Sequence, residues 1–106
     1  MADEEAAYSV EVWDLDKFFE ILERFPESQQ RRVTEFLSLH LTTRPRTMIP
    51  GLLKELKGKW KGVYQFECGG PRRLLYEVDE EARKVRVTYL GEHPDWDKRG
   101  RMDAGR

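Results

Sequence analysis

The sequence has little cysteine, no long apolar run and no secretion signal. Its one cysteine, Cys68, has no second cysteine to pair with, so an internal disulfide is excluded and a structural zinc site is disfavoured. No stretch approaches the roughly 18 apolar residues of a membrane-spanning helix. The first residues, MADEEAAYSV, are acidic and lack a hydrophobic signal region. We therefore expect a soluble protein of the cytoplasm.

Short motifs of common enzyme classes are also missing. There is no glycine-rich phosphate loop, and neither GxSxG nor HExxH occurs. We therefore expect no small-molecule cofactor and no metal ion. With 106 residues the chain forms one domain, and 12 aromatic residues are enough for a packed core.

Charge is divided unevenly along the chain. Residues 1–40 hold 10 acidic and 4 basic side chains, whereas residues 41–106 hold 10 acidic and 15 basic ones. A basic half is typical of a protein that binds a polyanion, and a lysine-rich surface that only keeps the protein in solution is the alternative.

The first part of the chain predicts one strand and two helices. We expect residues 1–7 to be a flexible acidic leader, and residues 8–13 alternate as a strand does. Asp14 is placed to cap a helix, and Pro26 ends it. Two apolar stripes at helical spacing follow, one at Leu15, Phe18, Phe19 and Leu22 and the other at Val33, Phe36, Leu37 and Leu41.

The second part predicts three short strands. Residues 51–57 look like one or two helical turns, and strands follow at 63–68, 73–78 and 85–90. The expected fold is α+β, with an N-terminal strand and a helical hairpin packed on one face of a small, mainly antiparallel four-stranded sheet. The order is β-α-α-β-β-β. We expect a single domain over residues 8–99 and a flexible basic tail over 100–106.

Alternation divides the strand residues between two faces of the sheet. The face expected to pack on the helices carries Tyr64, Phe66, Leu74, Tyr76, Val78, Val85, Val87 and Tyr89. The open face would carry Gln65, Glu67, Arg73, Glu77, Arg86 and Thr88. Cys68 falls on the buried face, which favours a core role over that of a nucleophile.

Three groups of residues are candidates for chemistry. The lysines around residues 54–61 can bind phosphates. An arginine on the open face, such as Arg73, can clamp a phosphate, although a salt bridge to Glu67 or Glu77 is the simpler interpretation. His93 follows the last strand, and a histidine is a suitable acid or base for cleaving an RNA phosphodiester.

These residues resemble the RelE/ParE superfamily of bacterial toxins from toxin–antitoxin pairs, and most closely its RelE and HigB mRNA-cleaving branches. The resemblance rests on Leu56-Lys57-Gly58, on the strand Arg73-Leu74-Leu75-Tyr76-Glu77-Val78, and on the ending Leu90-Gly91-Glu92-His93-Pro94-Asp95-Trp96-Asp97. It covers about 80% of the chain, and the β-α-α-β-β-β order agrees with it.

The resemblance implies a ribosome-dependent endoribonuclease that cuts mRNA without a metal, and a cognate antitoxin that blocks it. Arg73 would stabilise the transition state, and His93 or Glu67 would be the general base. The residues expected to contact RNA are Lys57, Lys59, Lys61, Arg72, Arg86, Trp96, Lys98 and Arg99. Two alternatives stay open: a ParE-like inhibitor of DNA gyrase, and a noncatalytic adaptor that binds RNA or protein.

Overall fold

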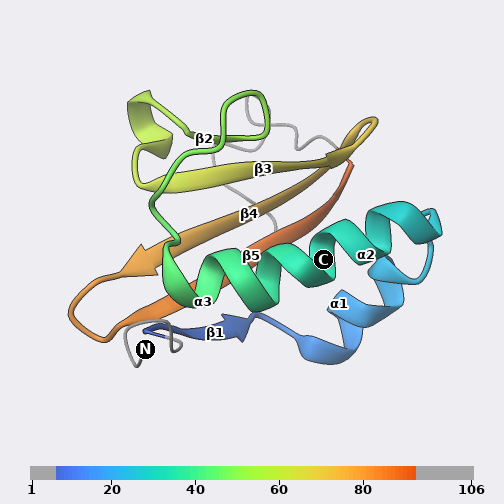
Figure 1. Cartoon of the computed structure of the whole chain (residues 1–106), viewed down its shortest axis with the longest axis horizontal. Coiled ribbons are helices and arrows are strands. Elements are labelled where there is room, and N and C mark those ends of the chain that lie inside the picture. Colours follow the sequence, from blue (N-terminus) through green and yellow to red (C-terminus); the bar gives the residue numbers. More distant parts are fainter. Residues whose placement is uncertain (1–6, 93–106) are drawn as a thin grey trace.

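The computed structural model describes residues 7–92, which form one sheet covered on one face by helices (Figure 1). Residues 1–6 and 93–106 lie outside the described part, including most of the expected leader and all of the expected tail. Among residues 7–92 no helix is long and apolar enough to cross a membrane. The elements are β1 (Ser9–Val12), α1 (Leu15–Leu22), α2 (Glu27–Glu35), the π-helical turn η2 (Phe36–His40), α3 (Leu41–Thr43), β2 (Leu53–Glu55), the 3-10 turn η3 (Gly58–Trp60), β3 (Val63–Gly69), β4 (Arg72–Asp79) and β5 (Lys84–Glu92).

The α+β class and the helical hairpin on one face are confirmed, but the sheet has five strands instead of four. Its order is β1-β5-β4-β3-β2, with β1 parallel to β5 and the other neighbours antiparallel. The additional strand is β2, where the sequence predicts helical turns. Lys54 pairs with Gln65 of β3, and Leu53 is buried in the core. Pairing with β3 therefore decides the conformation of a segment too short for periodicity to define.

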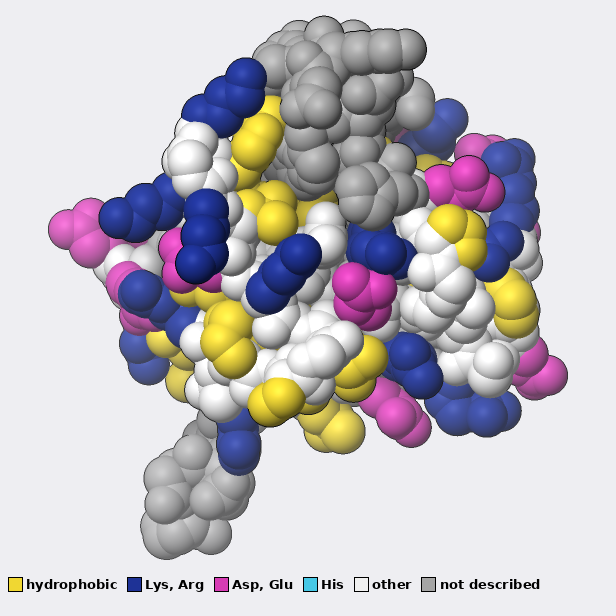
Figure 2. Space-filling model, turned by 90° about the horizontal axis from the view of Figure 1, so that it is seen from above, with side chains coloured by type: hydrophobic (Ala, Val, Ile, Leu, Met, Phe, Trp, Pro, Cys, Tyr) yellow, Lys and Arg dark blue, Asp and Glu magenta, His cyan; other side chains and the backbone are white. Residues whose placement is uncertain are grey.

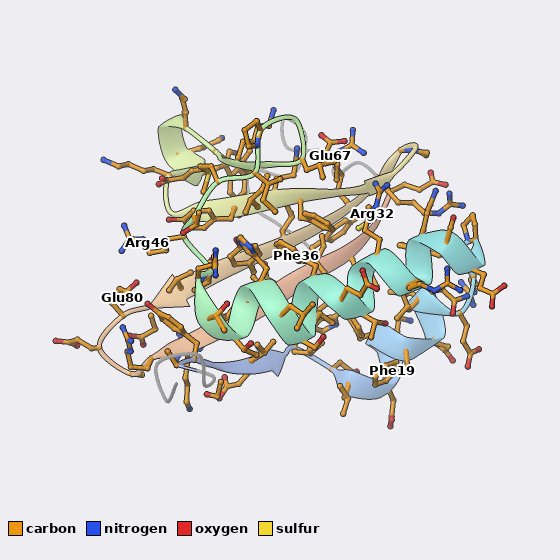
Figure 3. All side chains as sticks on the ribbon, in the orientation of Figure 1. Phe19, Arg32, Phe36, Arg46, Glu67 and Glu80 are labelled. Atoms are coloured by element: carbon orange, nitrogen blue, oxygen red, sulfur yellow. The ribbon has the colours of Figure 1, made fainter. Side chains whose placement is uncertain are left out.

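The helices are attached to the sheet through aromatic and branched side chains. Asp14 caps α1 as predicted, its Oδ1 accepting the Lys17 backbone N–H at 3.1 Å. Phe36 of η2 points from the helical layer toward the sheet, and its ring stacks on that of Phe66 with centroids 3.7 Å apart (Figure 3). Only half of the predicted α1 stripe is buried, because Leu15 and Phe19 face away from the sheet and stay more than half exposed.

A β-bulge in β5 reverses the expected faces of two residues. β4 and β5 pair Leu75 with Tyr89 but Tyr76 with Val87, so Thr88 is the additional residue of the bulge. Leu90 is consequently 2% exposed and belongs to the core, whereas Tyr89 lies opposite Leu75 on the open face. The expectation that Tyr89 packs against the helices is therefore wrong.

Candidate active site

An arginine and a glutamate lie side by side on the open face of the central strands. Glu67 of β3 pairs in register with Arg73 of β4, and Arg73 Nη2 lies 3.2 Å from Glu67 Oε1. The side chains are 15% and 33% exposed, so the pair is partly shielded from water. The salt bridge expected as the simpler role of Arg73 is thus present. Figure 3 shows Glu67 at the hairpin end of β3, with Arg46 and Glu80 at the opposite end of the sheet.

The tight turn between β3 and β4 also holds the Arg73 guanidinium. Arg73 Nη1 donates to the carbonyl oxygens of Gly70 at 2.8 Å and Arg72 at 3.1 Å. Its Nε is buried and has no hydrogen-bond partner among residues 7–92. The guanidinium is therefore fixed on two sides, which suits it to stabilising negative charge with little reorganisation.

A hollow of about 250 Å³ lies beside this pair. Its lining includes Glu67 together with Gly51, Leu52 and Lys54, so it opens toward β2. Lys54 is exposed and forms no ion pair within the described chain. A phosphate near the Arg73–Glu67 pair would therefore have a second cation available at the edge of the sheet.

The centre of the open face is less exposed to solvent than the sequence predicts. One row across the sheet consists of Lys54, Gln65, Leu75 and Tyr89. Gln65 is 3% exposed and Leu75 is fully buried. Gln65 Oε1 has no hydrogen-bond partner in the described part of the chain. The expectation of an open, solvated Gln65 is therefore wrong, and the site has a low-dielectric floor.

Tyr89 lies beside the candidate site, on the face of the sheet opposite to the one expected from the sequence. Its hydroxyl donates to the Glu92 carbonyl oxygen at 2.6 Å. Gly91 is opposite Arg73 in the register, and a Cβ built on it would lie 3.2 Å from the Tyr89 hydroxyl oxygen. The absence of a side chain at Gly91, the residue opposite Arg73, thus leaves space for the Tyr89 ring. Leu90 could have indicated the bulge from the sequence, because strict alternation along the strand places this apolar residue on the polar face.

Two predicted RNA-binding arginines are not part of this group. Arg72 lies on the other face of β4, where its guanidinium is 5.1 Å from the centre of the Phe25 ring. Strand alternation explains this, because Arg72 shares the face of Leu74. Arg86 is on the open face but is bound to carboxylates, with Nε 3.6 Å from Glu11 and Nη2 3.5 Å from Asp79.

The predicted lysines lie beyond β2, away from the Arg73–Glu67 pair. Lys59 belongs to η3, and Lys57 and Lys61 flank that turn. All three are exposed and form no ion pair with residues 7–92. They are therefore free to bind an anionic partner at the β2 edge of the sheet.

Other predicted residues are outside the site or outside the described chain. His93, Trp96, Lys98 and Arg99 lie beyond the described residues. Cys68 is fully buried, and burial raises the pKa of its thiol to about 12, although Arg73 and Arg32 oppose this shift. A thiol with this pKa is a poor nucleophile. No group of three histidine, cysteine or acidic side chains within residues 7–92 is placed to hold a metal ion.

The fold is similar to solved structures of bacterial toxins. The toxin–antitoxin complex RelBE2 of Mycobacterium tuberculosis has a chain that is 23% identical, with a TM-score of 0.60 over 82% of this chain and 99% of that one. A YoeB/ParE toxin of Agrobacterium tumefaciens is 15% identical, with a TM-score of 0.65 over 80% and 98%. The isolated RelE toxin of E. coli is 22% identical, with a TM-score of 0.59 over 86% and 89%. The chain thus has a RelE-like fold, as the sequence resemblance implied.

Comparison at the level of sequence adds no relative. No protein-family model matches the chain, and no curated protein matches it.

Proposed function

We propose that this protein is the toxin of a type II toxin–antitoxin pair and that it cleaves mRNA bound to the ribosome. The observation that carries the proposal is the fixed Arg73 guanidinium beside Glu67 on the open face of a RelE-like fold. The similar toxins support the toxin role, and one of them was solved together with its antitoxin. A cognate antitoxin is accordingly the proposed partner, and the cytoplasm the proposed place of action.

The proposed reaction needs only the RNA's own 2′-hydroxyl. A general base removes the proton of this hydroxyl, its oxygen attacks the adjacent phosphorus, and the bond to the 5′ oxygen breaks. The products are a 2′,3′-cyclic phosphate and a new 5′-hydroxyl, which takes up a proton. Arg73 stabilises the charge that accumulates on the phosphate oxygens.

Glu67 and His93 are the two candidates for the general base. Glu67 is bound to Arg73 in the free protein. A phosphate that binds Arg73 competes for the guanidinium and leaves the Glu67 carboxylate available to accept a proton. His93 then protonates the leaving oxygen or, in the alternative arrangement, is itself the base.

Three groups of residues are proposed to hold the RNA. Lys57, Lys59 and Lys61 bind phosphates at the β2 edge, and Arg86 binds at the other side of the open face. Trp96, Lys98 and Arg99 are also proposed to bind RNA, and this proposal rests on the sequence alone.

Cleavage products test the proposal. Purified protein is incubated with ribosomes programmed with an end-labelled mRNA, in a buffer whose only divalent metal is the magnesium that keeps the ribosomes assembled. We expect new fragments that end in a 2′,3′-cyclic phosphate. Intact mRNA that is bound but not cut would favour the noncatalytic adaptor instead.

Inhibition of DNA gyrase is a second candidate, because one similar structure is described as a YoeB/ParE toxin. A supercoiling assay separates the two functions. Loss of supercoiling without any cleavage of mRNA would replace the proposed nuclease function with this one.

A further inference from the structure

The turn between β3 and β4, which holds the Arg73 guanidinium, is not fixed by its own residues. Gly69 and Gly70 have φ angles of +130° and +57°, and Cys68 is the additional residue of a bulge just before them. Glycine has more conformational freedom than any other residue, and Pro71 restricts only its own φ. Fixing the Gly70 carbonyl oxygen, which accepts a hydrogen bond from Arg73 Nη1 at 2.8 Å, therefore requires a contact from outside the turn.

Helix α2 supplies this contact through the side chain of Gln29. A Cβ built on Gly69 would lie 2.6 Å from Gln29 Nε2 and 2.9 Å from Gln29 Cγ. Both distances are too short for a real Cβ, so Gln29 packs on the Gly69 backbone in the space that a side chain at this position would need. Helix and turn are thus in direct contact one residue before the carbonyl group that holds Arg73.

The start of α2 is a firm support for this side chain. The Gln29 backbone N–H donates to the Pro26 carbonyl oxygen at 2.9 Å, so Gln29 belongs to the first helical turn. Gln30 Nε2 donates to the Phe25 carbonyl oxygen at 2.9 Å, which ties this turn to the corner between α1 and α2. The same corner contacts β4, because the Arg72 guanidinium lies 5.1 Å from the centre of the Phe25 ring. Two neighbouring contacts therefore join the corner to the β3–β4 turn.

We propose that Gln29 is a positioning residue for the Arg73 guanidinium. By packing on Gly69 it keeps the Gly70 carbonyl oxygen within reach of Arg73 Nη1. Glu67 holds Nη2 of the same guanidinium. Gln29 acts through the turn and has no role on the substrate itself. Its effect on Arg73 is a property of the fold, whereas its effect on cleavage rests on the proposed nuclease function.

The turn depends on the shape of this side chain. Gln29 Oε1 is buried and has no hydrogen-bond partner among residues 7–92, so the contact with Gly69 is one of packing. Methionine has a similar length and no polar group to satisfy, and it is expected to replace Gln29, whereas alanine leaves the space beside Gly69 empty. Both substitutions keep the charge of this end of the molecule, on the right in Figure 2, where lysine and arginine side chains lie among acidic ones. Binding of RNA through these charges is therefore expected to stay the same.

Nitrogen NMR of the Arg73 side chain in the full-length protein tests the proposal without any cleavage reaction. Charge-assisted hydrogen bonds at both terminal nitrogens oppose rotation of a guanidinium, so we expect separate Nη1 and Nη2 signals in the wild type, assigned by their loss in Arg73→Lys. In Gln29→Ala the contact with Gly70 is expected to be lost and the two signals to merge, whereas in Gln29→Met they stay separate. Separate signals in Gln29→Ala, or merged signals in the wild type or in Gln29→Met, would overturn the proposal.

Kinetics then show whether this position matters for cleavage. We expect Gln29→Ala to lower kcat for ribosome-bound mRNA about tenfold with KM unchanged, because Arg73 is misplaced in the transition state, and Gln29→Met to restore the wild-type rate. Gln30→Ala is the matched control, since it removes the neighbouring glutamine and its hydrogen bond to Phe25, and it is expected to lower the unfolding midpoint without changing kcat. An unchanged kcat in Gln29→Ala, or an equal loss in both variants, would contradict the role in cleavage. Absence of cleavage by the wild type would refute the nuclease function instead, and the NMR signals would still decide the positioning.

A double-mutant cycle checks the contact between helix and turn. Gly69→Ala is expected to displace the Gln29 side chain, so Gln29→Ala then costs less than it does in the wild type. The strain of a positive φ at position 69 is present with and without the Gln29 side chain and cancels in the cycle. We therefore expect the losses in unfolding free energy, measured by chemical denaturation, to be less than additive in the double variant. Additive losses would show that the two residues do not interact, and the proposal would then fail.

Discussion

Arg73 Nη2 and Glu67 Oε1 lie 3.2 Å apart across the β3–β4 pair, and the Gly70 carbonyl oxygen holds the other terminal nitrogen of the guanidinium. Partial burial strengthens such an ion pair relative to one in water. In the proposed reaction an incoming phosphate replaces Glu67 as the partner of Arg73. In this proposal the pair connects substrate binding with release of the proposed general base.

Glu67→Gln tests that connection. The amide keeps the shape and an oxygen acceptor for Arg73 but cannot take a proton, so we expect mRNA cleavage to fall roughly 100-fold while RNA binding stays intact. Cleavage rates under single-turnover conditions and filter binding measure the two effects. Wild-type cleavage by the variant would rule Glu67 out as the base and leave that role to His93.

Gly91→Ala tests the position of Tyr89. The new Cβ would lie 3.2 Å from the tyrosine hydroxyl oxygen, and the backbone φ of +155° is one that alanine rarely adopts. We expect a loss of about 1 kcal/mol in stability and slower cleavage as the ring is displaced.

Gly62→Ala is the matched control for backbone strain in that experiment. Gly62 also has a positive φ, +96°, but a Cβ there meets nothing within 4 Å. Equal effects of the two substitutions on cleavage would show that the position of Tyr89 does not matter.

The fold was predictable where local chemistry decides it. Asp14 caps its helix, and the alternation of β3 and β4 places Phe66 and Leu74 in the core. β2 and the bulge at Thr88 were not predictable, because each depends on pairing with a distant strand.

The candidate site was predictable only where the alternation of a single strand determines which face a residue lies on. Arg73 and Glu67 follow from alternation, and alternation also places Arg72 on the opposite face, beside Phe25. Tyr89 and the buried Gln65 depend on the register across several strands, which no single strand encodes.

Phe36→Ala tests the attachment of the helices to the sheet. The Phe36 ring is buried and stacked between His40 and Phe66, so we expect a loss of about 3–5 kcal/mol in the free energy of unfolding. Leu39→Ala in the same helical turn is the control, because Leu39 is 66% exposed, and less than about 0.5 kcal/mol is expected there. Chemical denaturation measures both, and similar losses would contradict the packing described.

His40 makes stability depend on pH. Burial lowers the pKa of His40 below its ordinary 6.5, with Arg44 adding to this and the hydrogen bond to the Thr47 carbonyl opposing it. The unfolded chain therefore binds the proton more readily, and stability falls as the pH drops below about 6.5. Carboxylates with a lowered pKa, such as Glu80, act in a more acidic range.

Replacement of this histidine isolates its contribution. We expect His40→Gln to flatten the dependence of the unfolding midpoint on pH between about 7 and 5, measured by thermal unfolding. A midpoint that falls as steeply in the variant as in the wild type would contradict the assignment to His40.

The most direct test of the account compares cleavage of ribosome-bound mRNA by the wild type, by Arg73→Ala and by Arg31→Ala, an exposed helical arginine that controls for loss of charge. We predict that Arg73→Ala slows cleavage by about 10²–10³-fold while Arg31→Ala cuts like the wild type. Wild-type cleavage by Arg73→Ala would contradict the central claim that this guanidinium stabilises the transition state.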